Sequence, residues 1–238
     1  MTLRSLLNNF LDIIIPPRCI ICKKQGREQI CSDCFAKIRY VTPPYCKICG
    51  KPHDSRFEGG FCHECYRKKT PFDLARSATE YEGTIKEALH MFKFSNRHSL
   101  KIPLGKIMAD YLAANNGIDL SQIDIIMPVP LSRKKERSRE YNQAKLLAEE
   151  LSKHTGLAID DESLKRVKET TPQFELSREE RLKNLKDAFM ASDEVKDKAV
   201  LLIDDIYTTG STVKESSLAL KRSGAKRVCV LTLARAVQ

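Results

Sequence analysis

The chain has no apolar run long enough to cross a bilayer and no pattern of a secretory leader. A transmembrane helix needs about 20 consecutive apolar residues, and the 238 residues hold no such run. The first fifteen residues carry one Arg, contain Asp12 and lack a small-residue cleavage site, which argues against secretion. These absences predict a cytoplasmic protein without a transmembrane segment, with membrane association through partner proteins as the alternative.

Large apolar side chains are sparse between residues 19 and 70, but apolar residues recur at helical spacing before them. That spacing predicts a short amphipathic helix over residues 1–18, docked on the body of the protein, with contact to a membrane surface as the alternative. The apolar positions of this helix are Leu3, Leu6, Leu7, Phe10, Leu11 and Ile14.

Acidic residues are few in the first third of the chain. The whole chain has 41 Lys and Arg against 31 Asp and Glu, a net charge of +10, and residues 1–70 hold 13 basic and 6 acidic side chains. Such a basic segment suggests a polyanionic partner such as nucleic acid. Two four-thiolate zinc sites would each contribute about −2 and remove more than half of that local excess. Charge alone is therefore a weak argument for nucleic acid.

The nine cysteines are not scattered. Eight form four Cys-x-x-Cys pairs, and the ninth, Cys229, lies in an apolar run and is expected to be a buried core thiol. Without a secretory signal, four such pairs favour metal over disulfides and indicate a reducing compartment. Since a Cys-x-x-Cys turn aims two thiolates at one tetrahedral ion, two turns complete a closed structural zinc site. The spacing therefore predicts two structural Zn²⁺ ions.

How the four pairs combine is left open by the spacing. The sequential arrangement pairs neighbouring turns, and a cross-braced arrangement joins the first turn with the third and the second with the fourth. The predicted ligands of the two sequential sites are Cys19, Cys22, Cys31 and Cys34 for the first, and Cys46, Cys49, Cys62 and Cys65 for the second. We expect residues 19–70 to form this double zinc ribbon, with metal supplying much of its folding energy.

From residue 71 the cysteine pairs stop and short apolar segments alternate with helical patterns, which predicts a doubly wound α/β domain with a parallel sheet over residues 71–238. The expected strands are Leu74–Tyr81, Ile123–Val129, Val200–Ile203 and Val228–Leu233, with weaker candidates at Leu157–Ile159 and Leu164–Val167. The expected helices are Gly83–Phe94, Ile102–Ala114, about Glu140–His154 and Val213–Arg222.

Two adjacent carboxylates, Asp204 and Asp205, follow the apolar strand Val200–Ile203. The carboxyl end of a parallel strand is where open α/β sheets bind ligands. A loop that opens a helix offers N–H groups and a positive dipole end to a phosphate, and carboxylates suit hydroxyls or Mg²⁺. The pattern predicts a sugar-phosphate site, and a turn that merely caps a helix is the alternative. The loop residues are Thr208, Thr209, Gly210, Ser211 and Thr212.

A basic loop follows the strand that ends at Val129. Cationic side chains after a core strand suit a pyrophosphate group, although a solvated charged turn is the plainer interpretation. The candidate pyrophosphate-binding residues are Arg133, Lys134, Arg137 and Arg139.

The stretch Val200–Val213 resembles the phosphoribosyl-pyrophosphate (PRPP) motif of type I phosphoribosyltransferases. More narrowly, Pro128-Val-Pro130 followed by Arg139-Glu-Tyr-Asn-Gln143 is similar to the ComF family, with Glu140 and Tyr141 where that family has Gly and Phe. The resemblance extends to Tyr81-x-Gly83, Lys93-Phe94, the segment from Arg166 to Phe189 and the double zinc ribbon.

This resemblance implies a zinc module fused to a phosphoribosyltransferase-type domain, associated with DNA uptake in natural transformation. It implies that Asp204 and Asp205 hold the ribose hydroxyls, that the Thr208–Thr212 loop holds the 5′-phosphate, and that Mg²⁺ accompanies PRPP. The polar segment Glu169–Arg181 would act as a mobile flap. Single-stranded DNA and other DNA-uptake proteins are the implied partners.

Two functions stay open at this stage. Nothing in the zinc module has the pattern of a base-binding pocket, so a nucleotide-salvage transferase, its acceptor unknown, is the alternative to a DNA-handling protein. In the latter, aromatic side chains interleaved with cations would stack bases, although in so small a module they also suit its core. The aromatic residues are Phe35, Tyr40, Tyr45, Phe57, Phe61 and Tyr66, and the cations are Arg39, Lys47, Lys51, Arg56 and Lys68.

Overall fold

The computed structural model describes residues 17–53, 58–95, 97–114, 116–132, 136, 141–168 and 185–237. The predicted N-terminal helix over 1–18 thus falls almost wholly outside the described residues. So do the basic-loop residues Arg133, Lys134, Arg137 and Arg139, and so does the proposed flap. Among the described helices, each is too short or too polar to cross a membrane.

A four-stranded parallel sheet forms the centre of the molecule, with the strand order β1-β6-β5-β2. Its strands are β1 (Leu74–Glu80), β2 (Ile125–Pro128), β5 (Ala199–Tyr207) and β6 (Arg227–Arg235). A second sheet pairs β3 (Leu164–Arg166) antiparallel with β4 (Phe189–Ala191). The doubly wound parallel sheet is confirmed. The weak strand at Leu164–Val167 belongs to the small antiparallel pair instead, and Ile159 makes only an isolated parallel bridge to Ile126.

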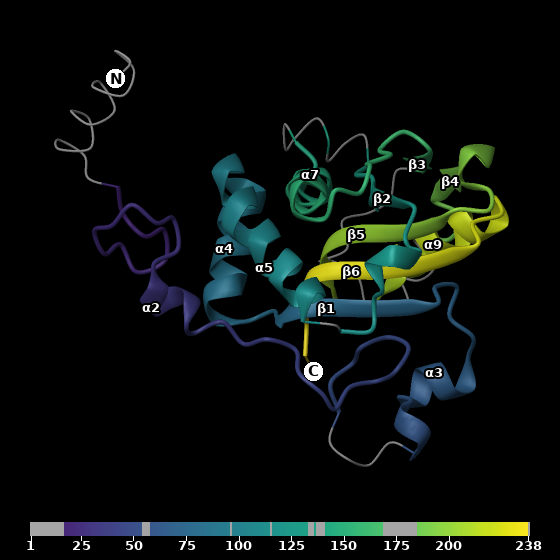
Figure 1. The fold of residues 1–238 in the computed structure, drawn as a ribbon, viewed down its shortest axis with the longest axis horizontal. Coiled ribbons are helices and arrows are strands. Elements are labelled where there is room, and N and C mark those ends of the chain that lie inside the picture. Colours follow the sequence, from purple (N-terminus) through teal and green to yellow (C-terminus); the bar gives the residue numbers. More distant parts are fainter. Residues whose placement is uncertain are drawn as a thin grey trace.

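Helices cover both faces of the sheet (Figure 1). One face packs against α4 (Gly83–Phe94), α5 (Lys101–Ala113) and α7 (Gln143–Thr155) through residues such as Leu201, Ile203 and Leu231. The alternate residues Val200, Leu202 and Val230 belong to the other core, which includes α9 (Ser211–Arg222). Because successive strand side chains point to opposite faces, a strand buried on both sides must be apolar throughout.

The remaining helices are short. They are α2 (Ser32–Phe35) and α3 (His63–Arg67) in the zinc ribbons, with the 3₁₀ turns η1 (Glu58–Gly60), η2 (His98–Leu100), η3 (Leu120–Gln122) and η5 (Asp193–Val195).

The outer edge of the sheet is β1, and it is lined by the segment between the two zinc ribbons and by the second ribbon. The Val41 N–H donates to the Ala78 carbonyl (3.1 Å), and the Ala75 N–H donates to the Ile48 carbonyl (2.7 Å). In Figure 1 the first ribbon, with α2, lies beside α4, and the second ribbon, with α3, lies below β1. The expected domain boundary near residue 70 falls between α3 and β1, and the extent of each domain stays a prediction.

The observed ends of β5 and β2 and the start of α9 differ from the expected bounds, and these differences shape the site. The strand expected to end at Ile203 continues to Tyr207, because β6 pairs with it as far as Arg235. On its other side β2 stops at Pro128, opposite Ile203. Asp204 and Asp205 therefore lie inside β5, at the point where its neighbour ends. Helix α9 begins at Ser211, two residues before the expected Val213, with Gly210 as its N-cap.

Candidate sugar-phosphate pocket and zinc sites

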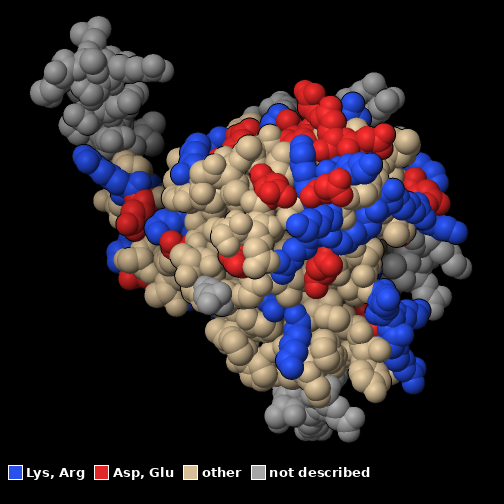
Figure 2. Space-filling view, turned by 45° about the vertical axis from the view of Figure 1, so that its right-hand side comes forward, with Lys and Arg blue, Asp and Glu red and all other residues tan. Residues whose placement is uncertain are grey.

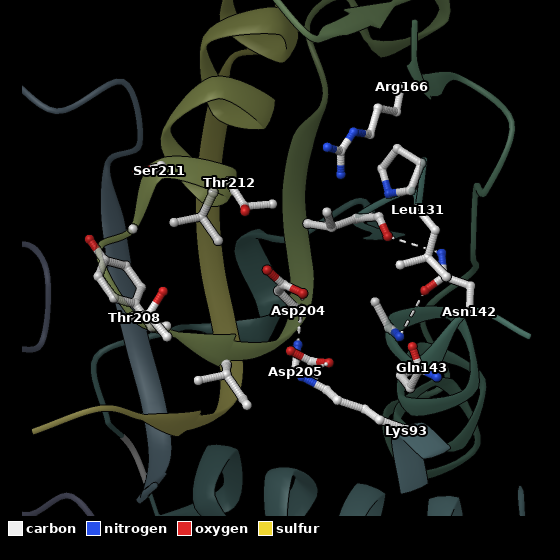
Figure 3. Close-up of a pocket in the computed structure, with 17 residues that line it drawn as sticks. Lys93, Leu131, Asn142, Gln143, Arg166, Asp204, Asp205, Thr208, Ser211 and Thr212 are labelled. Carbon is white, nitrogen blue, oxygen red and sulfur yellow. Dashed lines mark hydrogen bonds and ion pairs between the residues drawn. The ribbon is translucent and has the colours of Figure 1, made fainter. Parts of the chain in front are cut away.

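A pocket of about 160 Å³ opens where β2 ends beside β5. Figure 3 shows Asp204 directed into it, with Thr208, Ser211 and Thr212 on one side and Leu131, Asn142 and Gln143 on the other. The predicted carboxylates and most of the predicted loop residues thus line one cavity. The chain leaves β2 for α7 on one face of the sheet and leaves β5 for α9 on the other face. Such a switch point is where open α/β sheets form their ligand crevice.

Asp205 forms an ion pair that the sequence analysis did not foresee. The Lys93 Nζ lies 2.7 Å from Asp205 Oδ2, and both side chains are about 15% exposed. The Asp205 N–H donates to Asp204 Oδ1 at 2.9 Å. A partly buried carboxylate needs such compensation. The two carboxylates therefore differ: Asp205 is neutralised by Lys93, and Asp204 faces the cavity (Figure 3).

Lys93 is held at the pocket by the last turn of α4. The Tyr141 hydroxyl donates to the carbonyl of Phe92, next to Lys93. The ring centres of Tyr141 and His98 lie 4.0 Å apart, with the rings tilted by 40°. Tyr141 is the residue that stands where the ComF pattern has Phe, and here its hydroxyl ties α4 to the chain entering α7. An aromatic residue in a sequence does not show which distant carbonyl its hydroxyl will reach.

The loop before α9 is shaped by hydroxyls and by one glycine. The Thr209 and Ser211 hydroxyls lie 2.7 Å apart, and the Ser211 N–H donates to Thr209 Oγ1 at 3.3 Å. Gly210 has a φ of +75°, and a Cβ built on it would lie 2.3 Å from the hydroxyl oxygen of Tyr207. The loop therefore needs glycine for two reasons, its backbone angle and its contact with a buried ring.

A second cation missed by the sequence analysis is Arg166, on β3. Arg166 lines the pocket, and Figure 3 shows its guanidinium directed toward the space above Asp204. A guanidinium is suited to phosphate because its N–H groups match two oxygens at once. The sequence analysis includes Arg166 in the family resemblance but gives it no role, since its place in the pocket depends on how β3 packs against distant elements. Leu131 and Asn142, which lie on either side of the predicted basic loop in the sequence, both line the pocket.

The eight paired cysteines gather in two sets of four, and within each set the four sulfur atoms lie within 4.8 Å of one another. The sets are Cys19, Cys22, Cys31 and Cys34, and Cys46, Cys49, Cys62 and Cys65. Their arrangement is therefore sequential rather than cross-braced. The ninth cysteine, Cys229, is 1% exposed within the sheet, as expected of a core thiol.

Both sets use the same local geometry. The N–H of the third cysteine donates to the sulfur of the first, from Cys31 to Cys19 at 3.4 Å and from Cys62 to Cys46 at 3.3 Å. Burial opposes ionisation of Cys19, yet backbone N–H donors lower its pKa to about 6. Burial and its neighbours raise the pKa of Cys34 to about 12. Four crowded thiols cannot all ionise without a cation among them, so the donor set fits Zn²⁺.

Comparison with known proteins extends these observations. Residues 10–66 match a family model described as a double zinc ribbon domain, and residues 141–238 match one described as a phosphoribosyl transferase domain. The first match and the two thiol clusters support two structural zinc sites.

Curated relatives cover nearly the whole chain. Competence protein F of Haemophilus influenzae is 32% identical over 228 residues, which are 92% of this chain and 97% of the relative. DNA utilization protein YhgH of Escherichia coli K12 is 31% identical, over 94% of this chain and 99% of its own. Competence protein ComFC of Bacillus subtilis is 28% identical, over 87% and 85%. Among solved structures, a glutamine PRPP amidotransferase from B. subtilis aligns with 57% of this chain and 26% of its own at 21% identity, with a TM-score of 0.39.

Proposed function

Since the chain belongs to the ComF family of competence and DNA-utilization proteins, we propose that it handles single-stranded DNA during natural transformation and retains a PRPP-binding pocket. The PRPP-binding pocket is supported by one observation: Asp204 and residues of the Thr208–Thr212 loop line the same crevice. We place the protein in the cytoplasm, where it would work with other DNA-uptake proteins.

In this proposal each part of the pocket has a distinct task. Asp204 accepts hydrogen bonds from the ribose hydroxyls, with Asp205 fixed behind it by Lys93. The N-terminus of α9 and its hydroxyl loop hold the 5′-phosphate. Arg166 and the basic loop, with Arg133, Lys134, Arg137 and Arg139, attract the pyrophosphate. Asp204 also offers the oxygen ligands that Mg²⁺ prefers, so the residues fit the ion that accompanies PRPP.

The direct test is calorimetric titration of the protein with PRPP and Mg²⁺. We expect Asp204→Asn to weaken binding by about tenfold to a hundredfold, because hydrogen bonds to charged groups contribute about 1.5–3 kcal/mol. Asp110→Asn is the matched control, since Asp110 is exposed on α5, forms an ion pair with Lys106 and does not line the pocket. Equal affinities for the two variants would contradict the pocket assignment.

A groove beside the second zinc site supports the DNA half of the proposal. It measures about 590 Å³ and is bounded by Cys49 and Cys65, by α3 and by Lys214 of α9. Its cationic members are Arg67, Lys68, Lys69 and Lys214, and its acidic member, Glu64, pairs with Lys214 at 3.7 Å. On the same helix Tyr66 is 74% exposed. A cationic groove with an exposed aromatic ring suits a single strand, whose phosphates need charge and whose bases need a stacking surface.

The other aromatic residues predicted to stack bases have different surroundings. Tyr45 lies under the Arg76 guanidinium at 4.7 Å, and Phe61 lies under the Lys47 ammonium at 5.7 Å, both within the second ribbon. Phe35 packs on a core cluster, Tyr40 is 36% exposed, and Phe57 lies outside the described residues. We therefore assign base stacking to Tyr66 and count Phe35, Tyr45 and Phe61 as part of the ribbons.

Salt dependence tests this surface with a matched pair of variants. Lys68→Gln/Lys69→Gln should weaken single-stranded DNA binding and reduce the slope of log K against log salt by about 1.4, at about 0.7 per phosphate contact. Lys23→Gln/Lys24→Gln removes the same charge from the first ribbon and should leave the slope nearly unchanged. A larger effect from the first-ribbon pair would place the DNA elsewhere. Fluorescence anisotropy at several salt concentrations measures both.

A nucleotide-salvage transferase is the second candidate, favoured by the match to a phosphoribosyl transferase domain. One assay distinguishes the two candidate functions: it measures the release of pyrophosphate from PRPP when a purine or pyrimidine base is added. We expect no release above the rate without base, because nothing in the zinc module has the pattern of a base-binding pocket. Base-dependent release that is abolished by Asp204→Asn would establish the transferase instead.

A further inference from the structure

Two residues join the second zinc site to the sugar-phosphate pocket. Tyr207 ends β5 and Arg235 ends β6, and they are partners in the strand register. The Arg235 guanidinium carbon lies 4.1 Å from the centre of the Tyr207 ring. Both residues are 5% exposed or less. A buried guanidinium needs partners, and the stack on Tyr207 provides only one of them.

The zinc ribbon provides the others. Arg235 Nη1 donates to the Cys49 carbonyl at 2.7 Å, and Nη2 lies 3.9 Å from Cys49 Sγ. Cys49 is one of the four ligands in the second thiol cluster. Groups that hydrogen-bond to a metal ligand orient it and tune the site. A tetrathiolate zinc site carries a net negative charge, so a guanidinium beside it is electrostatically matched.

On its other side Tyr207 supports the phosphate loop. Added at Gly210, a Cβ would lie 2.3 Å from the Tyr207 hydroxyl oxygen and 2.4 Å from Cζ, so the glycine backbone lies directly on the ring. Tyr207 lines both the pocket and the groove beside the zinc site. The contacts therefore run without a break from Cys49 through Arg235 and Tyr207 to Gly210.

We propose that Arg235 is a positioning residue that couples zinc in the second site to the shape of the phosphate loop. With zinc bound, the Cys49 turn holds Arg235 in place, Arg235 holds the ring of Tyr207, and the ring sets the loop that opens α9. Loss of this zinc frees the stack and lowers affinity for the sugar phosphate. The effect on affinity rests on the proposed function. Because coupling is reciprocal, a bound sugar phosphate also slows loss of this zinc.

The first zinc site is an internal control. Its contact with the α/β domain is at the other end of the sheet region, where the Thr84 hydroxyl donates to the Cys34 carbonyl at the start of α4. No recorded contact among the described residues links that cluster to Tyr207 or to the loop before α9. Zinc in the first site should therefore leave the phosphate loop before α9 unaffected.

The first experiment needs no ligand. Hydrogen exchange followed by mass spectrometry compares the zinc-loaded wild type with Arg235→Met, which keeps the length of the side chain and removes its hydrogen bonds. We expect faster exchange in two separated segments, the Cys46–Lys51 turn and the Tyr207–Val213 loop. Arg235→Lys keeps the positive charge but loses the two parallel N–H donors of the guanidinium. Its exchange rates should lie between those of the wild type and Arg235→Met. If exchange changes in the zinc turn alone, or in neither segment of a folded protein, the coupling is refuted.

The second experiment tests reciprocity with ribose 5-phosphate as the probe. Zinc loss to a coloured chelator is followed with and without the probe, and affinity is measured by calorimetry. In the wild type the probe should slow release of one of the two ions, and Arg235→Met should weaken binding by about tenfold, a typical coupling strength. Cys22→Ser, which impairs only the first site, should keep both effects.

The two proposals fail in different ways. If the wild type binds neither ribose 5-phosphate nor PRPP, the proposed function is wrong, and the exchange experiment alone then decides the coupling. If the wild type binds the probe, while Arg235→Met binds it equally well and releases zinc at the same rate, the coupling is wrong and the pocket assignment stands.

Discussion

At the scale of single residues, Gly210 links backbone geometry to binding. Gly210→Ala should cost stability through its φ of +75° and displace the loop from Tyr207. We expect PRPP affinity to fall by about tenfold or more, which corresponds to about 1.4 kcal/mol. Calorimetric titration measures it.

Gly156 provides the matched control for that substitution. It has nearly the same φ, +74°, and nothing lies within 4 Å of a Cβ built on it. Gly156→Ala should cost about 1 kcal/mol of folding stability at the end of α7, because an L side chain disfavours the left-handed backbone region, and should leave PRPP affinity unchanged. If both variants lose binding equally, general destabilisation is responsible and the contact with Tyr207 is not.

At the scale of elements, Asp73 ties the start of β1 to β6 and α9. The Val228 N–H donates to Asp73 Oδ2 at 2.8 Å, and Lys221 Nζ lies 2.7 Å from the same oxygen. Burial raises the pKa of this carboxyl, but the ammonium and the N–H outweigh it and hold the pKa below its ordinary value of 3.8. The ionised form is therefore the one that stabilises the fold.

The sign of that shift predicts a pH dependence. The contribution of Asp73 is fully present above the unfolded-state pKa of about 3.9 and is lost as the pH falls through the lower folded value. Asp73→Asn should cost about 1 kcal/mol at pH 7, since the carboxylate is 44% exposed and solvent screens its lysine partner. In urea unfolding the difference from wild type should shrink below about pH 3. A constant difference at every pH would show that the charge contributes nothing.

At the scale of the whole molecule, the zinc ribbons cover an edge of the sheet. Residues 39–41 and Ile48 hydrogen-bond to β1, which otherwise would present unpaired N–H and C=O groups. Exposed edges of this kind pair with other chains. The ribbons depend on metal for their folding, so zinc keeps this edge covered.

Removal of zinc should therefore cause self-association. A chelator under reducing conditions should remove two zinc ions per chain, measured by metal analysis, and light scattering should show larger particles while much of the α/β circular dichroism persists. Cys229→Ala should retain both ions, because Cys229 lies in the sheet core. Fewer than one zinc ion per chain in freshly purified protein would refute the metal sites. A chelated protein that stays monomeric would refute the role of the edge.

The distribution of surface charge also belongs to the scale of the whole molecule, and it affects polyanion binding more than the net charge does. Figure 2 shows many Lys and Arg side chains in a band across one face, with Asp and Glu clustered above the band and others interspersed along it. A net charge of +10 spread evenly would attract any polyanion, whereas a band beside acidic clusters favours a strand lying along a defined path.

The sequence by itself determined the α/β class, the eight thiol ligands and the position of the acidic motif. These depend on residues close along the chain: apolar periodicity, Cys-x-x-Cys spacing, and carboxylates directly after a strand. Helix α4 was predicted with its observed bounds for the same reason. The extension of β5 to Tyr207 was not predicted, because the last residues of β5 are held by pairing with β6 and do not form an apolar run.

Only the tertiary structure decided which distant groups meet. The sequential pairing of the cysteines, the approach of Lys93 to Asp205 and the position of Arg166 all depend on how separate elements pack. Arg235 and Cys49 are 186 residues apart, yet they share a hydrogen bond. No local pattern encodes such a contact, because it arises when β6 enters the sheet beside β5 and the second ribbon docks on the edge of β1. The proposed coupling between zinc and the phosphate loop therefore depends on tertiary packing, and no sequence motif predicts it.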